Sequence, residues 1–496
     1  MLNQPESTRV LLDRAVRLHI GGDYRGSIPY YIRAVRQAEQ DAKLTGAPVD
    51  PDVLHAAGVA LAMAGKRAEA IEFLESALQN GKSKSGAVWS ALGLAYVESR
   101  QLGRAERCYR LACRADPESV ANWTGYANLA ACGGDLSLAE RRYQLALDTP
   151  ARDAEELMAQ AMTQLRRGHW RKGWRGYEAR RSTGMWAERN SHAAKLRTDK
   201  TLVEYTYWRL PDKGDRVLVL TEQGVGDAVQ FARYVPAFAE RFGVVVHIHA
   251  YDQIVDLLAG GLPGITVADR ASGVPEGTAG WALMLSLPAM LRESRISVVP
   301  PPIRPFGLQW TRSQGERQGE VPDNAPTAGF KSLMVAPYVP RPRVFVHSRG
   351  NALHGYDFDR SAPAGVLEDA VRGTGGEVVG AKFSGGAIGA GEREIVVEPS
   401  WRSSVDALLG CDYCVTVDTG LAHVAGSLGV PTLLCVPTIP EWRWGRPGAT
   451  TTPWYPSVTL VRRSRTDRWD EVAVVIASKL MALQPEVQGA DVSAVG

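Results

Sequence analysis

The 496-residue chain lacks the features that would place it in a membrane or in a disulfide scaffold. No run of 18 consecutive apolar residues occurs, so the sequence predicts no membrane-spanning helix. Glu6 and Asp13 interrupt the stretch where a signal peptide would be apolar, which favours a cytosolic location. Lys and Arg (57) nearly balance Asp and Glu (54), leaving a net charge of +3. With so small a net charge the chain has no long-range electrostatic field that attracts anions, so an anionic ligand must bind at a local cluster of positive side chains.

Cysteine is also scarce, with six in the whole chain, too few for a disulfide framework. Cys411 and Cys414 have the spacing of redox and zinc pairs. No second Cys or His pair lies nearby, and the two residues open an apolar strand pattern. The pattern favours two buried core residues.

The first third of the sequence repeats itself at intervals of 34 or 35 residues. The unit that starts at Ser85 has tetratricopeptide residue types at their fixed positions, namely Trp89, Leu92, Gly93, Tyr96, Ala105, Tyr109, Ala112 and Pro117. Small residues let two helices approach closely, and aromatic rings fill the space between them. The spacing predicts about five helix pairs over residues 1–181. Such arrays commonly bind a peptide or partner protein, although support of the next domain is an equal alternative.

The end of the repeat region is basic and aromatic. Residues 165–181 carry seven positive side chains and one acid, Glu178, with Trp170, Trp174 and Tyr177 among them. This composition can bind nucleic acid. A solvated helix face whose aromatic rings pack inward is the favoured interpretation, so nucleic acid is the less favoured partner.

From residue 213 onward, strand patterns alternate with helix patterns. In 213–305 we expect strands at 216–221, 243–250, 265–269 and 281–286, a glycine-rich turn at 222–228 and a helix at 229–242. In 342–483 we expect strands at 343–348, 377–383, 394–399, 413–417 and 431–437, and helices at 402–409, 421–429 and 468–483. Alternation of this kind predicts two parallel, doubly wound sheets that bind ligands at the carboxyl ends of their strands. Residues 182–212 are expected to be a connecting segment, 306–341 a proline-rich linker and 484–496 a tail.

Two of the strand ends carry residues suited to chemistry. After the first strand, Gly224 and Gly226 allow a tight turn, and Asp227 stands at a helix start. A carboxylate there can act as a general base or can simply cap the helix, and the pattern alone favours the cap. After a later strand that ends at Asp418, residues 419–421 open a helix whose free N–H groups suit a diphosphate.

His423 lies one turn into that helix, within reach of a phosphate or ribose oxygen. The alternative is a capped helix in which His423 packs against its neighbours.

These strings resemble a known enzyme family. TEQGVGDAVQFARY (221–234) and VDTGLAHVAGSLGVPT (417–432) are similar to the amino-terminal and nucleotide-sugar motifs of the bacterial heptosyltransferases, glycosyltransferase family 9, and above all of their tetratricopeptide-linked members. The blocks PTIPEWRW (437–444) and PWYP (453–456) follow in the family's order. The resemblance implies a repeat array followed by a GT-B fold of two facing Rossmann-like sheets. It also implies inverting transfer from a nucleotide-diphosphate sugar, with no metal and no other cofactor.

The resemblance further implies roles for individual residues. Asp227 is the candidate base that takes the proton of the acceptor hydroxyl. The expected donor-binding residues are Arg349, Arg360, Asp418, Thr419, Gly420, Leu421, His423 and Glu441, and the expected acceptor-side residues are Gln223, Gly224, Gly226 and Gln230. Relatives usually carry a W-x-G-N-x-x-H-x-x-D-like loop where this chain reads HSRGNALH (347–354), so the two arginines are assigned by position. Trp442 and Trp444 either close over the nucleotide or fix one α/β half against the other.

The sequence thus predicts a cytosolic glycosyltransferase whose repeats dock a protein or glycan acceptor. Two alternatives stay open. One is an enzyme of the same fold that glycosylates a modified nucleobase of DNA, suggested by residues 165–181. The other is a repeat-based binding scaffold with an inactive transferase half.

Overall fold

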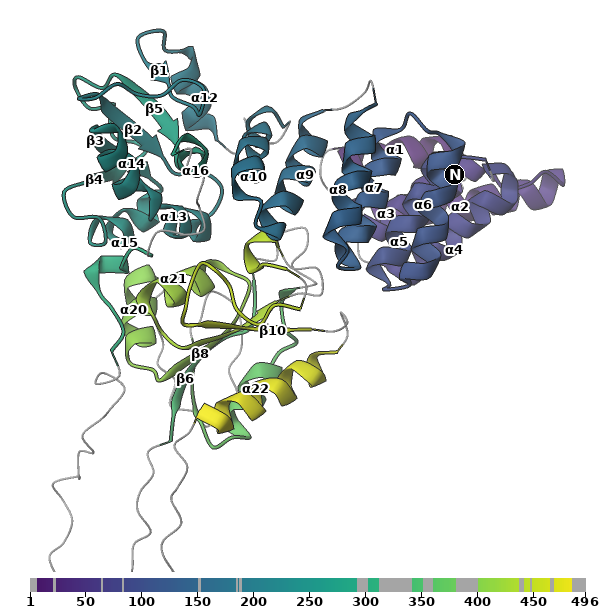
Figure 1. The fold of residues 1–496 in the computed structure, drawn as a ribbon. Helices are drawn as coiled ribbons and strands as arrows, with labels where there is room; N and C mark the ends of the chain where they lie inside the picture. The colour runs from purple at the N-terminus through teal and green to yellow at the C-terminus, as the bar shows by residue number, and fades with distance from the viewer. Residues whose placement is uncertain are drawn as a thin grey trace, which may run out of the picture. The chain divides into compact units, whose positions relative to one another are not determined.

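The computed structural model describes most of the chain. The described residues are 7–20, 24–63, 66–82, 84–149, 153–183, 186, 190–291, 302–311, 341–350, 360–380, 400–436, 441–446, 448–463 and 468–483. The chain forms two compact units, Met1–Thr183 and Gly184–Gly496 (Figure 1). The predicted strand at 394–399, most of the predicted linker at 306–341 and the tail at 484–496 lie outside the described residues.

The first unit is helical. Its helices are α1 (Thr8–Ile20), α2 (Tyr24–Thr45), α3 (Pro51–Met63), α4 (Arg67–Ala77), α5 (Gly86–Glu98), α6 (Leu102–Ala115), α7 (Val120–Cys132), α8 (Leu136–Leu147), α9 (Ala154–Arg167) and α10 (Trp170–Tyr177), with a π turn η1 (Leu78–Lys82) and a 3₁₀ turn η2 (Glu178–Ser182). Consecutive helices pack against each other as the pairs α1/α2, α3/α4, α5/α6, α7/α8 and α9/α10. The predicted helical region is confirmed.

Glycine makes the close packing of this unit possible. Tyr109 of α6 is 2% exposed and lies between α5 and α7. A Cβ atom on Gly93 would lie 3.0 Å from its ring, and one on Gly125 would lie 2.3 Å away. Only a residue without a side chain fits at Gly125, as the repeat pattern requires of small residues at helix crossings.

The basic and aromatic segment closes this helical unit. Trp174 and Tyr177 are 1% and 4% exposed, so their faces are not available for base stacking. Glu178 accepts hydrogen bonds from Arg180 (2.8 Å) and Arg181 (3.3 Å). Trp174 and Tyr177 pack inward, as in the favoured interpretation, and Trp170 is half-buried, while Arg171, Lys172 and Arg175 are exposed.

The second unit contains two parallel five-stranded sheets. The strands are β1 (Val203–Glu204), β2 (Arg216–Leu220), β3 (Val245–Ala250), β4 (Thr266–Asp269) and β5 (Gly280–Leu283) in the first half, and β6 (Arg343–His347), β7 (Glu377–Gly380), β8 (Tyr413–Val417), β9 (Thr432–Val436) and β10 (Val458–Arg462) in the second half. Their orders are β1-β5-β2-β3-β4 and β10-β9-β8-β6-β7. An α/β region with parallel sheets is confirmed, and β1 and β10 were not expected.

Helices lie before, between and after the parallel strands of this unit. They are α12 (Ser191–Thr198), α13 (Val225–Phe231), α14 (Tyr234–Phe242), α15 (Val255–Ala259) and α16 (Leu287–Met290) in the first half, and α19 (Val366–Arg372), α20 (Trp401–Leu409), α21 (Gly420–Leu428) and α22 (Trp469–Leu483) in the second half. Short 3₁₀ turns are η3 (Asp252–Ile254), η4 (Met284–Ser286), η5 (Pro305–Gly307) and η6 (Trp442–Trp444).

The prediction of a single helix at 229–242 is wrong, because the structure has two helices there. α13 begins inside the glycine-rich turn, and α14 follows it after Ala232 and Arg233. Pro236 has no N–H to donate to the carbonyl of Ala232, four residues earlier, so the ladder breaks there. The N–H of Val235 takes that carbonyl instead, at 3.0 Å.

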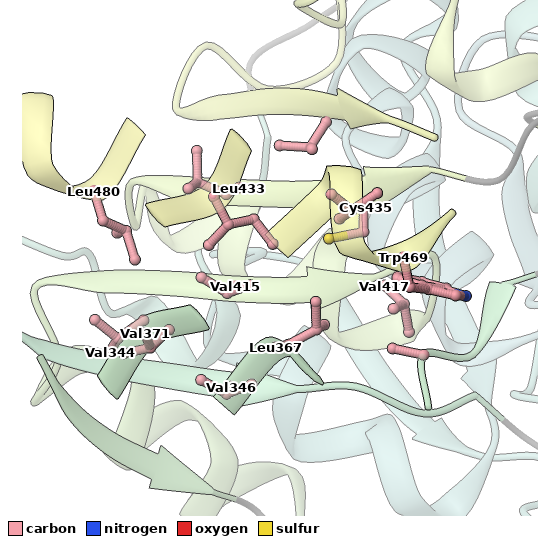
Figure 2. Packing of buried hydrophobic residues seen from close by; sticks show 14 residues of the cluster. Val344, Val346, Leu367, Val371, Val415, Val417, Leu433, Cys435, Trp469 and Leu480 are labelled. Atoms are coloured by element: carbon pink, nitrogen blue, oxygen red, sulfur yellow. The ribbon is translucent and has the colours of Figure 1, made fainter. Parts of the chain in front are cut away.

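One face of the second sheet holds the apolar cluster drawn in Figure 2. Alternate residues of β6, β8 and β9 point to this face, and side chains of α19 and α22 cover it (Figure 2); the cluster includes Val344, Val346, Val415, Val417, Leu433, Cys435, Leu367, Val371, Trp469 and Leu480. Burying an aliphatic side chain of this kind completely contributes roughly 1.5–3 kcal/mol to the free energy of unfolding. This core fixes the register of the strands whose ends carry the site.

The strand orders indicate where a ligand would bind. In the first sheet β2 pairs with both β3 and β5, and in the second sheet β8 pairs with both β6 and β9. The chain therefore reverses its winding direction at β2/β5 and at β6/β8. Ligands of doubly wound sheets bind at the carboxyl ends of the strands at such a point. Asp227 follows β2 and Asp418 follows β8.

The segment before the first sheet is packed more tightly than expected. The expected connecting segment 182–212 contains α12 and β1, and its Trp186 and Leu196 pack against Leu218 and Trp281 of the first sheet. Leu202 packs there too, so apolar residues make this segment part of the first half.

Two expectations about membranes and cysteines can be compared with the described residues. Within these ranges no helix is long and apolar enough to cross a bilayer. Cys411 and Cys414 are buried and unlinked. No group of three or more His, Cys, Asp or Glu side chains in the described part of the chain is arranged around a possible metal ion.

Candidate functional site

The turn after β2 presents Asp227. Gln223 has φ 61°, a left-handed conformation that is uncommon for a residue with a side chain and that marks local strain. The hydroxyl of Tyr251 holds this turn by donating to the Gln223 carbonyl at 2.7 Å. Gly224 caps α13, and its N–H donates to Oδ2 of Asp227 at 3.1 Å. Asp227 therefore does part of a capping role from the third helical position, while Oδ1 is left for other contacts.

The segment after β8 presents a helix N-terminus. Thr419 caps the nine-residue helix α21 without a side-chain hydrogen bond, and its buried Oγ1 has no partner among the described residues. The first N–H groups of a helix have no partner within the helix. Nη1 of Arg360 donates to the carbonyl of Asp418 at 3.2 Å, which places a cation at the same strand end.

The two strand ends come together at Gly226. A Cβ atom on Gly226 of α13 would lie 2.7 Å from Cδ2 of His423 and 3.2 Å from the Cα of Gly420, both in α21. A Cβ atom on Gly420 would lie 3.5 Å from the Gly226 nitrogen. The expected acceptor-side and donor-side motifs are thus in contact with each other across the two α/β halves.

Replacing Gly226 by alanine is expected to separate these helices. The new Cβ would overlap a buried imidazole and a backbone atom, so we expect a loss of about 1–3 kcal/mol in the free energy of unfolding of the second unit. The melting temperature of the second unit's own transition, followed by calorimetry of the full chain, measures it. Gly273→Ala is the matched control, because nothing lies within 4 Å of its Cβ position. Equal melting temperatures for the two variants would contradict the close approach.

Arg443 of η6 joins the two halves, and the sequence interpretation did not select it. Its Nη2 pairs with Asp227 and its Nη1 with Glu441. Its Nε donates to Oε1 of Gln230 at 3.0 Å. The only signal was its place between the two tryptophans of the WRW block, a position that spacing alone does not connect with α13.

Aromatic side chains enclose the same region. The imidazole of His423 stacks on Trp444 with ring centroids 5.0 Å apart, and its Nδ1 lies 3.0 Å from the Tyr455 hydroxyl. Nη1 of Arg233 donates to the Trp454 carbonyl at 2.9 Å, and its guanidinium lies over the Tyr455 ring. Arg443 of the WRW block and Trp454 and Tyr455 of the PWYP block therefore contact residues of the first half. The ring contacts of Trp444 with His423 and of Trp442 with Trp454 lie within the second half, so the role expected of Trp442 and Trp444 stays a prediction.

The environment shifts the pKa of three titratable groups of the site. Burial raises the pKa of Asp227, and the Arg443 guanidinium opposes the rise. Burial, reinforced by the charge of Glu441, raises the pKa of Asp418 to about 6. Burial lowers the pKa of His423 well below its ordinary value, and the arginines nearby act in the same direction. His423 is therefore neutral at pH 7.

Other expected site residues are placed differently. Gln230, expected in an acceptor-side loop, lies inside α13, is fully buried and binds Arg443. Leu421 is 2% exposed, so only its backbone can face a ligand. Arg349 is exposed after β6, and no contact joins it to the site within the described ranges.

Comparisons with known proteins give distant similarities. No protein-family model matches the chain. The chain is 22% identical over 457 residues to Protein FlbA of Caulobacter vibrioides, and this match covers 87% of the chain and 73% of Protein FlbA. A thermophilic TPR protein of Thermus thermophilus matches 36% of this chain and 92% of its own, with 20% identity and a TM-score of 0.32. The iron-containing dodecameric glycosyltransferase TibC of enterotoxigenic E. coli matches 55% of this chain and 76% of its own, with 14% identity and a TM-score of 0.35. These values do not assign the chain to a family.

Proposed function

We propose that the second unit is a GT-B glycosyltransferase that moves a sugar from a nucleotide-diphosphate donor to an acceptor hydroxyl with inversion. The observation that carries this proposal is the contact of Gly226 with Gly420 and His423. It brings a partly exposed carboxylate from one sheet edge beside a helix N-terminus from the other. Both edges lie at winding reversals, where ligands of such sheets bind.

In this mechanism Asp227 is the general base. Its side chain keeps 18% of its surface exposed, so an acceptor hydroxyl can reach it. The carboxylate takes the hydroxyl proton while the oxygen attacks the anomeric carbon and the bond to the diphosphate breaks. A carboxylate whose pKa is raised is a better proton acceptor near neutral pH than an ordinary aspartate.

The leaving diphosphate gains negative charge as that bond breaks. The N–H groups at the start of α21, the hydroxyl of Thr419 and the guanidinium of Arg360 can stabilise it without a metal ion. The neutral His423 fixes this end of the helix against Trp444 and Tyr455. Asp418, whose pKa is raised to about 6, is still mostly ionised at pH 7, so the N–H groups of α21 and the Arg360 guanidinium must also offset its repulsion of the diphosphate.

We assign residues 213–305 to the acceptor side and 342–483 to the donor side, and the repeats (1–181) to docking a protein or glycan acceptor. An array of helix pairs offers extended surfaces that suit such partners.

A donor screen tests the proposal. The purified full chain is incubated with UDP-, GDP-, ADP- and CMP-linked sugars, and released nucleotide is measured by mass spectrometry. We expect one nucleotide-diphosphate sugar to be hydrolysed slowly without acceptor, equally with and without a chelator, and to raise the melting temperature. A chain that neither binds nor hydrolyses any donor would contradict the proposal and favour the binding scaffold.

A further inference from the structure

A buried arginine connects the proposed base to the opposite half of the second unit. Arg443 belongs to the second half, whereas Asp227 and Gln230, two of its partners, belong to α13 in the first half. Its own side chain is 9% exposed. A guanidinium in this position can bind several acceptors at once through its planar fork of donors.

The backbone around Arg443 is fixed as firmly as its side chain. Its N–H donates to Oε2 of Glu441 at 2.9 Å, and its carbonyl accepts from Nε1 of Trp454 at 2.8 Å. Its guanidinium lies 4.5 Å from the centre of the Trp442 ring. Arg443 is therefore held in place by its own half before it reaches Asp227.

We propose that Arg443 is the positioning residue of this site, keeping Asp227 ionised and oriented only while the two α/β halves are in contact. The inference rests on the proposed function, since it takes Asp227 as the base. It adds a condition to that function: a base that is active only in the assembled site cannot activate a hydroxyl when the halves are apart.

The charges around the ion pair of Arg443 and Asp227 support this assignment. Glu441 is the other charged group that acts on Asp227, and Arg443 also acts on Asp418 and on His423, which is neutral. Arg360 acts on Asp418, and Arg233 acts on His423. The nearest cation to Asp227 is Arg443, which forms a direct ion pair with it. A partly buried carboxylate without a paired cation takes up a proton more readily.

The first test is the pH profile of the transferase. In Arg443→Gln the acidic limb of the kcat/KM profile is expected to move to higher pH by about 1–3 units, because the opposite charge that lowers the pKa of the base is gone. Arg443→Lys should restore part of the shift. Arg372→Gln, which breaks an exposed ion pair with Asp369, is the matched control and should leave the profile unchanged.

The second test does not depend on activity. Without Arg443 the pKa of Asp227 rises further in the folded state, so the carboxyl stabilises the fold at low pH and this contribution is lost as pH rises through the folded pKa. The melting temperature of Arg443→Gln should therefore fall further below that of the native chain at pH 8 than at pH 5. Adding Asp227→Asn should remove most of that pH dependence.

The outcomes separate the two proposals. If the native chain transfers no sugar, the proposed function fails, and the pH-dependent melting still tests the role of Arg443. A loss of melting temperature that is the same at pH 5 and pH 8, or an unshifted acidic limb, would show that Arg443 only packs between the halves and would overturn the inference.

Discussion

Replacing Asp227 by asparagine is expected to lower kcat for sugar transfer by about 10²–10⁴-fold. The amide cannot accept the acceptor's proton, but it preserves the size of the side chain. Donor affinity should change little, because the donor is proposed to bind at α21, across the site from this side chain. Initial rates of nucleotide release with acceptor present, together with donor titrations by calorimetry, measure the two quantities separately.

Asp256→Asn is the matched control for that experiment. Asp256 is an exposed carboxylate at the start of α15 in the same α/β half. It should keep native kcat and native donor affinity. Full transfer activity in Asp227→Asn would mean that another group takes the proton, and the assignment of the base would have to be abandoned.

The largest effect on stability is expected at the end of the helical repeats. Glu178 and Arg180 form an ion pair whose side chains are only 4% and 2% exposed. Glu178→Ala leaves the guanidinium buried without its carboxylate, which should destabilise this region by about 3–5 kcal/mol. Hydrogen exchange of α9 and α10 in the full chain reports the loss locally, which matters because a chain with two units does not unfold as one.

Two further variants interpret the result at Glu178. Glu69→Ala removes an ion pair whose side chains are 46% and 50% exposed, so it should cost at most about 1 kcal/mol. Replacing Glu178 and Arg180 together by methionine should recover much of the loss, since apolar residues of similar size often substitute for a buried pair. A loss at Glu178→Ala as small as that at Glu69→Ala would refute the argument.

Much of the fold could be predicted because its signals are local. The repeat spacing around Tyr109 specified the helix pairs, and apolar runs such as 216–220 and 413–417 marked the central strands. The strand β1 was missed because two residues give no pattern. The break before α14 depends on Pro236, whose effect falls four residues earlier in the chain.

The site was only partly predictable for a different reason. Asp227 and Asp418 follow recognisable strands, so the sequence alone indicates them as candidates. Arg443 could not be indicated in this way, because its function depends on contacts with residues more than 200 positions away, as the pairing with Asp227 across 216 residues shows. Likewise, Gln230 was expected in an acceptor-side loop, but no local pattern could indicate that its partner is Arg443 of the other half.

The chain segment that crosses between the two sheets affects where the second unit could be divided. Arg304 and Phe306 lie so close to Gly261 and Gly260 that no side chain fits between them, whereas Trp310 donates to the carbonyls of Leu428 and Cys411. Residues 304 and 306 thus contact the first half and residue 310 contacts the second, so we propose that the border between the halves lies around Leu308, close to the expected domain end at 305. A chimaera that exchanges one half for that of a relative would have to be joined there, and it would have to carry a compatible partner for Arg443 as well.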